Sequence, residues 1–220
     1  MEPKRILCYG DSNTWGATPG TGARISQQKR WTGICQQNLG SGYRILEEGL
    51  PGRTSVYDDP CDGLMNGLDA LGYTLASQKP LDLVVLFLGT NDIKFTDAYG
   101  VASGIDTLLH RIIHANVFYN GSCPIFPDTP KVLLVAPPRV PPQVDQAMPD
   151  SRFTGRSGIT EEFPRLYRNL AKIYGAAFLD ANEYVALSPV DCLHMDEESH
   201  EILGKAIAEA IREQFEKADC

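Results

Sequence analysis

Short apolar runs, recurring between stretches of helical spacing, constrain the fold of this 220-residue chain more than any other feature. The runs are rich in Val, Ile and Leu and lack polar alternation, as is typical of parallel strands covered on both faces. The runs expected to form strands span residues 5–9, 43–46, 81–88, 131–136 and 176–179. The connecting segments carry apolar residues at helical spacing. Helices are expected from near Trp31, over 61–78, over about 103–119, from Thr160, and from Asp196 to about Lys217.

Strand–helix alternation repeated five times predicts one α/β domain spanning residues 1–220. Its expected form is a three-layer, flavodoxin-like sandwich around a five-stranded parallel sheet with right-handed crossovers. A chain of this length buries roughly 70% of its unfolded surface, enough for an ordinary core. Two stretches, 17–29 and 137–158, are too long for plain connections in a compact domain. Both follow the carboxyl end of a strand, where open α/β sheets bind ligands, so walls or a lid of a site are expected there.

Charge and hydropathy exclude several classes of partner. The net charge of −8 disfavours binding to a phosphate backbone, so no nucleic acid is expected. No apolar run approaches the roughly 18 residues that span a bilayer, so no membrane partner is expected either. The first residues lack the layout of a secretory signal, which favours a cytoplasmic protein. The six cysteines are scattered without a C-x-x-C pair and are expected to be free thiols.

The chain has only four histidines, so the candidates for a catalytic base or a metal ligand of this type are few. His110 and His114 lie four apart in an expected helix, but the general-base Glu of a zinc motif is missing, so a packed or solvated face is expected. His200 lies in the last expected helix, where a surface contact with Glu197 is the simpler interpretation. His194 differs because it follows Asp191 by three residues in an irregular segment, which lets the carboxylate turn back onto the imidazole.

Polar groups follow three expected strands. Ser12 comes directly after the first strand, behind the small Gly10; Gly52 follows the second and Asn91 the third. Because the carboxyl ends of parallel strands meet at one edge, a hydroxyl, a glycine N–H and a side-chain amide are predicted to converge there. Each motif alone is also compatible with an ordinary turn.

Taken in order, the segments Gly10–Ser12, Gly52, Gly89–Asp92 and Asp191–His194 resemble the four blocks of the SGNH (GDSL) hydrolases. The strings 5–16, 30–33, 47–60 and 81–94 are similar to the arylesterase/perhydrolase subgroup of that family. The resemblance implies ester hydrolysis without a metal or organic cofactor, and a homo-oligomer whose loops narrow the site. In that subgroup the acyl group is also transferred to alcohols or hydrogen peroxide.

The resemblance also implies a role for each matching residue. Ser12 is the expected nucleophile, His194 the expected base and Asp191 its orienting carboxylate. The expected oxyanion donors are the N–H groups of Ser12 and Gly52 and the side chain of Asn91. Bordering residues that could contact substrate are Trp15, Arg53 and Lys94. Burial of Trp15 as plain core and exposure of Arg53 to solvent remain open. Asp11 and Asp92 are expected to hold their turns, and Cys192 to be a small packed residue.

Other functions fit less well. An aspartyl-phosphate enzyme built on Asp11 lacks a second acidic residue, because Asn13 stands in its place. A non-catalytic binding module lacks a glycine-rich phosphate loop, and an α/β-hydrolase lacks a G-x-S-x-G motif. The expected substrate is a small ester with a short acyl or aryl group. Within the same fold, a carbohydrate acetylesterase and a lysophospholipase or thioesterase are the alternatives.

Overall fold

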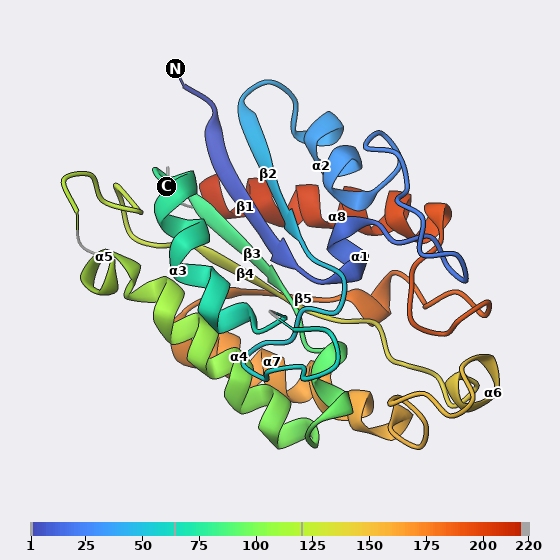
Figure 1. Ribbon diagram of the computed structural model, residues 1–220. Coiled ribbons are helices and arrows are strands. Elements are labelled where there is room, and N and C mark those ends of the chain that lie inside the picture. Colours follow the sequence, from blue (N-terminus) through green and yellow to red (C-terminus); the bar gives the residue numbers. More distant parts are fainter. Residues whose placement is uncertain (1, 64, 120, 217–220) are drawn as a thin grey trace.

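A computed structural model describes residues 2–63, 65–119 and 121–216; Lys217 and Cys220 lie outside these ranges. The chain forms a five-stranded, all-parallel sheet in the order β2-β1-β3-β4-β5 (Figure 1). The strands are β1 (Lys4–Gly10), β2 (Tyr43–Gly49), β3 (Leu83–Phe87), β4 (Val132–Ala136) and β5 (Ala177–Asp180). The fold class predicted from the alternation is therefore confirmed.

Long helices cover both faces of the sheet. Helices α2 (Trp31–Leu39) and α8 (Glu197–Glu216) lie together on one face. Helices α3 (Gly67–Gln78), α4 (Ala98–Ile113) and α7 (Phe163–Tyr174) lie on the other (Figure 1). The shorter elements are α1 (Ser12–Trp15), η1 (Asn91–Lys94), α5 (Ala115–Phe118), α6 (Val144–Ala147), η2 (Ser157–Glu162) and η3 (Ala181–Glu183).

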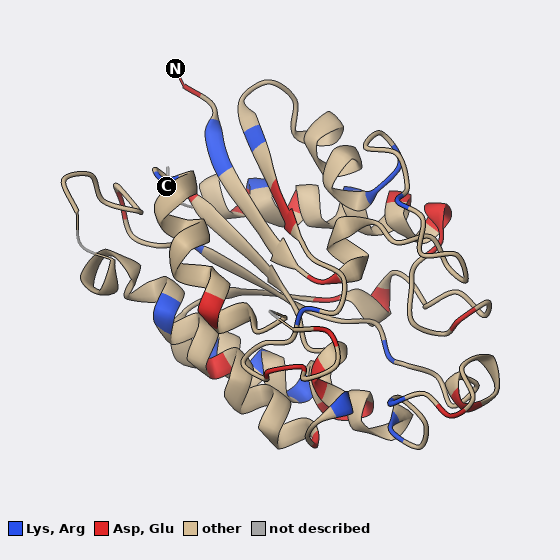
Figure 2. Cartoon of the chain, in the orientation of Figure 1, with Lys and Arg blue, Asp and Glu red and all other residues tan. Residues whose placement is uncertain are grey.

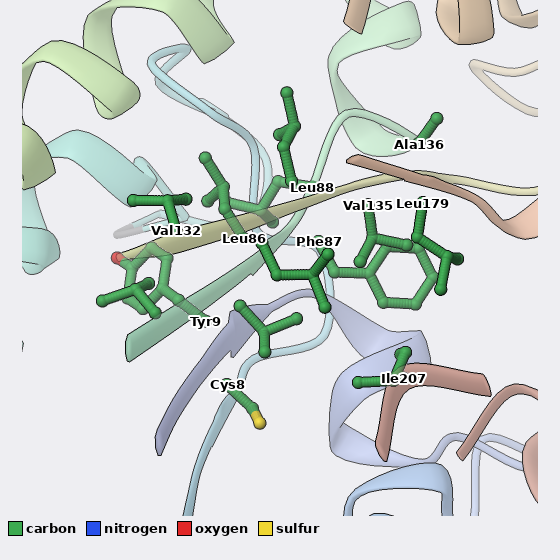
Figure 3. Packing of buried hydrophobic residues seen from close by; sticks show 14 of the residues in the cluster. Cys8, Tyr9, Leu86, Phe87, Leu88, Val132, Val135, Ala136, Leu179 and Ile207 are labelled. Carbon is green, nitrogen blue, oxygen red and sulfur yellow. The ribbon is translucent and has the colours of Figure 1, made fainter. Parts of the chain in front are cut away.

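The core lies between the sheet and these helices. Every residue of β3 is buried, which explains why its sequence shows no polar alternation. Figure 3 shows side chains of β1, β3, β4 and β5 packed together, with Ile207 of α8 beside them. On the α2 side, the Trp31 ring meets Phe87 edge-on at 6.2 Å between centroids.

Two helices differ from their expected bounds because capping side chains fix their ends. The helix expected from residue 61 begins at Gly67, since Asn66 caps it by accepting a hydrogen bond from the Leu68 N–H. The helix expected from residue 103 begins at Ala98, where Asp97 accepts from the Gly100 N–H at 2.9 Å. This helix ends at Ile113, and the separate α5 follows.

The described surface carries charges of both signs. Figure 2 shows basic and acidic residues interspersed along the chain. In the described ranges, no helix is long and apolar enough to cross a bilayer.

The cysteines within those ranges are free thiols; they are Cys8, Cys35, Cys61, Cys123 and Cys192.

His200 of α8 is a buried group that links two helices. Its Nδ1 accepts a hydrogen bond from the Trp31 N–H at 3.2 Å, which satisfies an amide at the start of α2. The bond requires an unprotonated Nδ1. Burial lowers the pKa of His200 from 6.5 to about 4. The surface contact with Glu197 that was expected for His200 is therefore wrong, because the imidazole is buried and neutral.

The sign of this shift predicts acid sensitivity. Between pH 6.5 and 4 the unfolded chain binds more protons at this residue than the folded chain, so stability falls as pH is lowered through that window. The free energy of unfolding should drop by about 2 kcal/mol between pH 7 and pH 5 through this residue. Urea titrations at the two pH values should show a smaller drop in His200→Asn, which keeps an acceptor but cannot titrate.

The matched control is His110→Asn, which changes an exposed histidine of α4. This variant should keep the wild-type difference between the two pH values. An equally large drop in His200→Asn and the wild type would contradict the proposed linkage.

Candidate active site

Ser12 is positioned by a sharp turn at the carboxyl end of β1, where α1 begins. A Cβ on Gly10 would lie 2.0 Å from Thr14 Oγ1 and 2.8 Å from the Phe87 carbonyl oxygen, so only glycine lets the chain turn here. Asp11 caps the turn by accepting a hydrogen bond from the Asn13 N–H at 2.9 Å. Ser12 is the first residue of α1 and keeps 9% of its surface exposed. Helix α1, which begins with Ser12, thus lies at the edge where the strands end (Figure 1).

The loop between η3 and α8 brings a histidine and an aspartate to this hydroxyl. The Nε2 atom of His194 lies 3.1 Å from Ser12 Oγ, although the two residues are 182 positions apart. Nδ1 of His194 lies 2.8 Å from Asp191 Oδ2. Between them Cys192 adopts a left-handed φ of 60°, which turns the carboxylate back towards the ring. Cys192 is itself buried, and burial raises its thiol pKa.

The Asp191 carboxylate is saturated with donors. Burial opposes its charge, but the His194 ring and the N–H groups of Gly20, His194 and Leu193 donate to it and hold its pKa well below its usual range. An ionised carboxylate can only accept, so Nδ1 of His194 must donate, and in the neutral ring Nε2 is then the acceptor that faces Ser12. This hydroxyl–imidazole–carboxylate chain can activate the hydroxyl as a nucleophile.

Two groups that hold this arrangement were not predicted from the sequence. Asn13 donates from Nδ2 to the Leu193 carbonyl at 3.0 Å and accepts from the Met195 N–H at 2.9 Å, so it binds the chain on both sides of His194. Its position next to Ser12 shows that it lies near the site, but not that its side chain binds the segment around His194. The Gly20 N–H donates to Asp191 Oδ2 at 2.8 Å. The segment 17–29, expected to border the site, therefore reaches it through a backbone amide.

Three strand ends converge beside Ser12. The Leu50 N–H donates to the Gly10 carbonyl at 3.1 Å, which places the turn after β2 against the end of β1. In that turn Gly52 has a φ of +82°. Asn91 donates from Nδ2 to the Arg53 carbonyl at 3.2 Å and so lies beside the same turn. In the described part of the chain, neither the Ser12 N–H nor the Gly52 N–H has a protein acceptor, which leaves both available to a ligand.

Asp92 fixes the residues that follow this turn. It is fully buried, and its two carboxyl oxygens accept from the Ser55 N–H at 2.9 and 3.0 Å; the Ser55 hydroxyl donates as well. Burial raises the pKa of Asp92 to about 7 and that of Asp11 to about 6. Asp11 binds the Asn13 N–H within its own turn, as the sequence predicted, whereas Asp92 binds Ser55 in the segment after β2 and not its own turn.

The residues expected to border the substrate have varied surroundings. Trp15 is half-buried, with the Arg24 guanidinium 5.0 Å from its ring centroid. Lys94 is buried and pairs with Asp59 at 2.9 Å. Arg53 is buried too, and its guanidinium donates to backbone carbonyls. The polar heads of Lys94 and Arg53 thus have protein partners, and these bonds do not support direct contact with substrate.

The segment 137–158 contains α6 and is fastened beside η1. Arg152 pairs with Asp59 at 2.6 Å, and Arg156 donates to the Ile93 carbonyl at 3.0 Å. Asp59 therefore has two cationic partners, Arg152 and Lys94, and these ion pairs tie the segment to η1, which carries Asn91. The ring centroids of His110, in α4, and His114, which directly follows α4, lie 4.6 Å apart, and both residues are exposed.

Comparisons with known proteins agree on one group of hydrolases. The model of the GDSL-like lipase/acylhydrolase family matches residues 8–202. An aryl esterase from M. smegmatis is 38% identical with a TM-score of 0.86, and the match covers 96% of this chain and 99% of that one. A carbohydrate acetylesterase from Sinorhizobium meliloti is 36% identical with a TM-score of 0.87 and the same coverage. A search of curated proteins gave no match.

Proposed function

The chain belongs to the GDSL-like lipase/acylhydrolase family, and from that premise we propose that it is a serine esterase for short acyl or aryl esters. It is a carboxylic ester hydrolase of the SGNH type; the substrate range and the role of each residue are the proposal. The observation that carries the proposal is the continuous chain of short contacts from Ser12 Oγ through His194 to Asp191.

In the proposed acylation step, Ser12 Oγ attacks the ester carbonyl carbon while His194 Nε2 accepts the hydroxyl proton. The ionised Asp191 stabilises the resulting imidazolium. The carbonyl oxygen becomes an oxyanion, and in this proposal the N–H groups of Ser12 and Gly52 and the Asn91 amide bind it. When the tetrahedral intermediate collapses, the carbon–oxygen bond to the alcohol breaks, and His194 returns the proton to that alcohol.

The acyl-enzyme is then resolved by the same groups in reverse order. Water loses a proton to His194 as its oxygen attacks the acyl carbonyl, and Ser12 leaves as a hydroxyl. An alcohol or hydrogen peroxide can take the place of water and gives a new ester or a peracid. We include such acyl transfer in the proposal because the segments around the site resemble the subgroup in which it occurs. The same resemblance supports a homo-oligomer.

A substrate series tests the proposed range. We expect kcat/KM on p-nitrophenyl esters to be highest from acetate to butyrate and to fall steadily towards palmitate. An organophosphonate should label one residue, Ser12, in the same preparation, as mapped by peptide mass spectrometry. A preference for palmitate would contradict the short-chain proposal and favour a lysophospholipase or thioesterase. Labelling elsewhere, without hydrolysis of any ester, would contradict the esterase itself.

A carbohydrate acetylesterase is the second candidate, because one of the similar structures carries that name. Acetylated monosaccharides assayed beside p-nitrophenyl acetate distinguish the two. A higher kcat/KM on the sugar ester would favour the second candidate, whereas a higher value on the aryl ester favours the first. The proposed acylation chemistry is the same in both.

A further inference from the structure

Arg53 is an unusual group to find beneath an esterase site. Its side chain is buried, with 5% of the residue exposed. In the described ranges, no carboxylate lies within ion-pair distance of it, and its Nε atom has no hydrogen-bond partner. Burying a cation without a paired anion is costly, because the charge loses its hydration. The cost is offset in part by the Tyr9 ring, whose centroid lies 4.2 Å from the guanidinium carbon.

The hydrogen bonds of Arg53 join the ends of three strands. Its Nη1 donates to the Gly10 carbonyl at 3.0 Å, at the end of β1, and also to the Glu48 carbonyl of β2. Its own carbonyl accepts from Asn91, which follows β3. Its N–H donates to the Leu50 carbonyl at 3.1 Å and so closes the turn that contains Gly52.

Each proposed oxyanion donor therefore lies within two residues of Arg53 or of a carbonyl that it binds, or is itself bonded to Arg53. Ser12 is two residues after Gly10, Gly52 directly precedes Arg53, and the Asn91 amide is bound to the Arg53 carbonyl. Donors that are fixed before the reaction need no reorganisation as the oxyanion forms, and this is the main source of their catalytic effect.

The charge of the guanidinium also matters at this edge of the sheet. Carbonyl oxygens at the ends of β1 and β2 carry partial negative charge close to the residues of the site. Arg53 places its positive charge on two of them, those of Gly10 and Glu48. A neutral ester is little affected by this charge, whereas an oxyanion is strongly affected. An interaction that grows in the transition state raises kcat rather than lowering KM.

We propose that Arg53 is a positioning residue that fixes the three oxyanion donors and neutralises the strand-end carbonyls behind them. The inference rests on the proposed function, since it concerns the oxyanion of an ester reaction. It differs from the substrate contact predicted from the sequence, because the guanidinium is aimed at the protein backbone. Substrate contact predicts a change in KM, and positioning predicts a change in kcat.

The test compares Arg53→Met and Arg53→Lys with matched variants of Arg111. Arg111 on α4 also lies over a ring, with its guanidinium carbon 4.3 Å from the Phe118 centroid, but it has no bond to a strand end. For p-nitrophenyl acetate we expect Arg53→Met to lower kcat roughly 10- to 100-fold, with KM changed less than about twofold. Arg53→Lys should recover part of this loss, because lysine keeps the charge but not the planar fork. Arg111→Met and Arg111→Lys should match the wild type.

A pair of inhibitors separates positioning from a general loss of structure. A trifluoromethyl ketone forms a tetrahedral oxyanion with an active serine, whereas the matching methyl ketone binds as a neutral carbonyl. The Ki of the first should rise in Arg53→Met by about the same factor as kcat falls, and the Ki of the second should not change. Organophosphonate titration normalises kcat to the number of intact sites.

Two results would overturn the inference: an unchanged kcat, whether or not KM rises, or equal weakening of the binding of both ketones. If Arg53→Met does not fold, Arg53→Lys decides the matter, with a several-fold fall in kcat and weaker trifluoromethyl ketone binding expected. Failure of the proposed function is distinguishable, because the wild type itself would then neither hydrolyse esters nor be labelled at Ser12.

Discussion

Replacing Ser12 by alanine is expected to lower kcat on p-nitrophenyl acetate by roughly 10⁴-fold or more. The hydroxyl is the group in contact with His194 Nε2, and no acyl-enzyme can form without it. His194→Ala should cause a loss of similar size, because the two groups act as a unit and their effects do not add. The measurement is initial-rate kinetics on folded protein, with the double variant expected to be no slower than either single one.

The matched control is Ser103→Ala on the exposed face of α4, where the hydroxyl donates to the Tyr99 carbonyl within its own helix. It should keep wild-type kcat and organophosphonate labelling, whereas Ser12→Ala should lose both. Near wild-type turnover in Ser12→Ala would show that another nucleophile is used. A large loss in Ser12→Ala with full activity in His194→Ala would instead remove the imidazole from the mechanism.

The sheet and the principal site residues could be predicted because they depend on backbone topology. All-apolar runs such as β3 report burial on both faces, and parallel strands must end at one edge. Ser12 and Asn91 could thus be placed together without knowing any side-chain direction. His194 was selected because Asp191 precedes it by three residues in a segment expected to be irregular, where the carboxylate can turn back onto the imidazole.

The supporting groups could not be predicted because they depend on side-chain direction and on contacts distant in sequence. Asn13 and Leu193 are 180 residues apart, and no periodicity encodes their hydrogen bond. The bond from the Gly20 N–H is made by backbone, which every residue has. Arg53 directly follows Gly52 in the sequence, but this position does not show whether its guanidinium faces the substrate or the strand ends. His200 illustrates the same limit, since its partner Trp31 lies in another helix.

Replacing Asn91 by alanine is expected to lower kcat roughly 100- to 1000-fold while KM changes little. One Nδ2 hydrogen is directed to the Arg53 carbonyl, so the other remains for a developing oxyanion. Because that charge is absent from the ground-state ester, losing the donor raises the barrier without weakening substrate binding. Asn91→Asp should be at least as slow, since it replaces the donor by a negative charge beside the oxyanion. Steady-state kinetics on p-nitrophenyl acetate measure both variants.

The control for Asn91 is Asn38 of α2, an exposed residue whose amide also donates to a backbone carbonyl, that of Ile34 at 2.8 Å. Asn38→Ala should keep wild-type kcat, because its hydrogen bond is distant from the strand ends. If the bond from Asn91 to Arg53 were purely structural, Asn91→Ala would lower the unfolding midpoint but bind a trifluoromethyl ketone as tightly as the wild type. Weaker binding of that ketone, in a variant with an unchanged midpoint, is the result expected of an oxyanion donor, because only the charged adduct uses the second amide hydrogen.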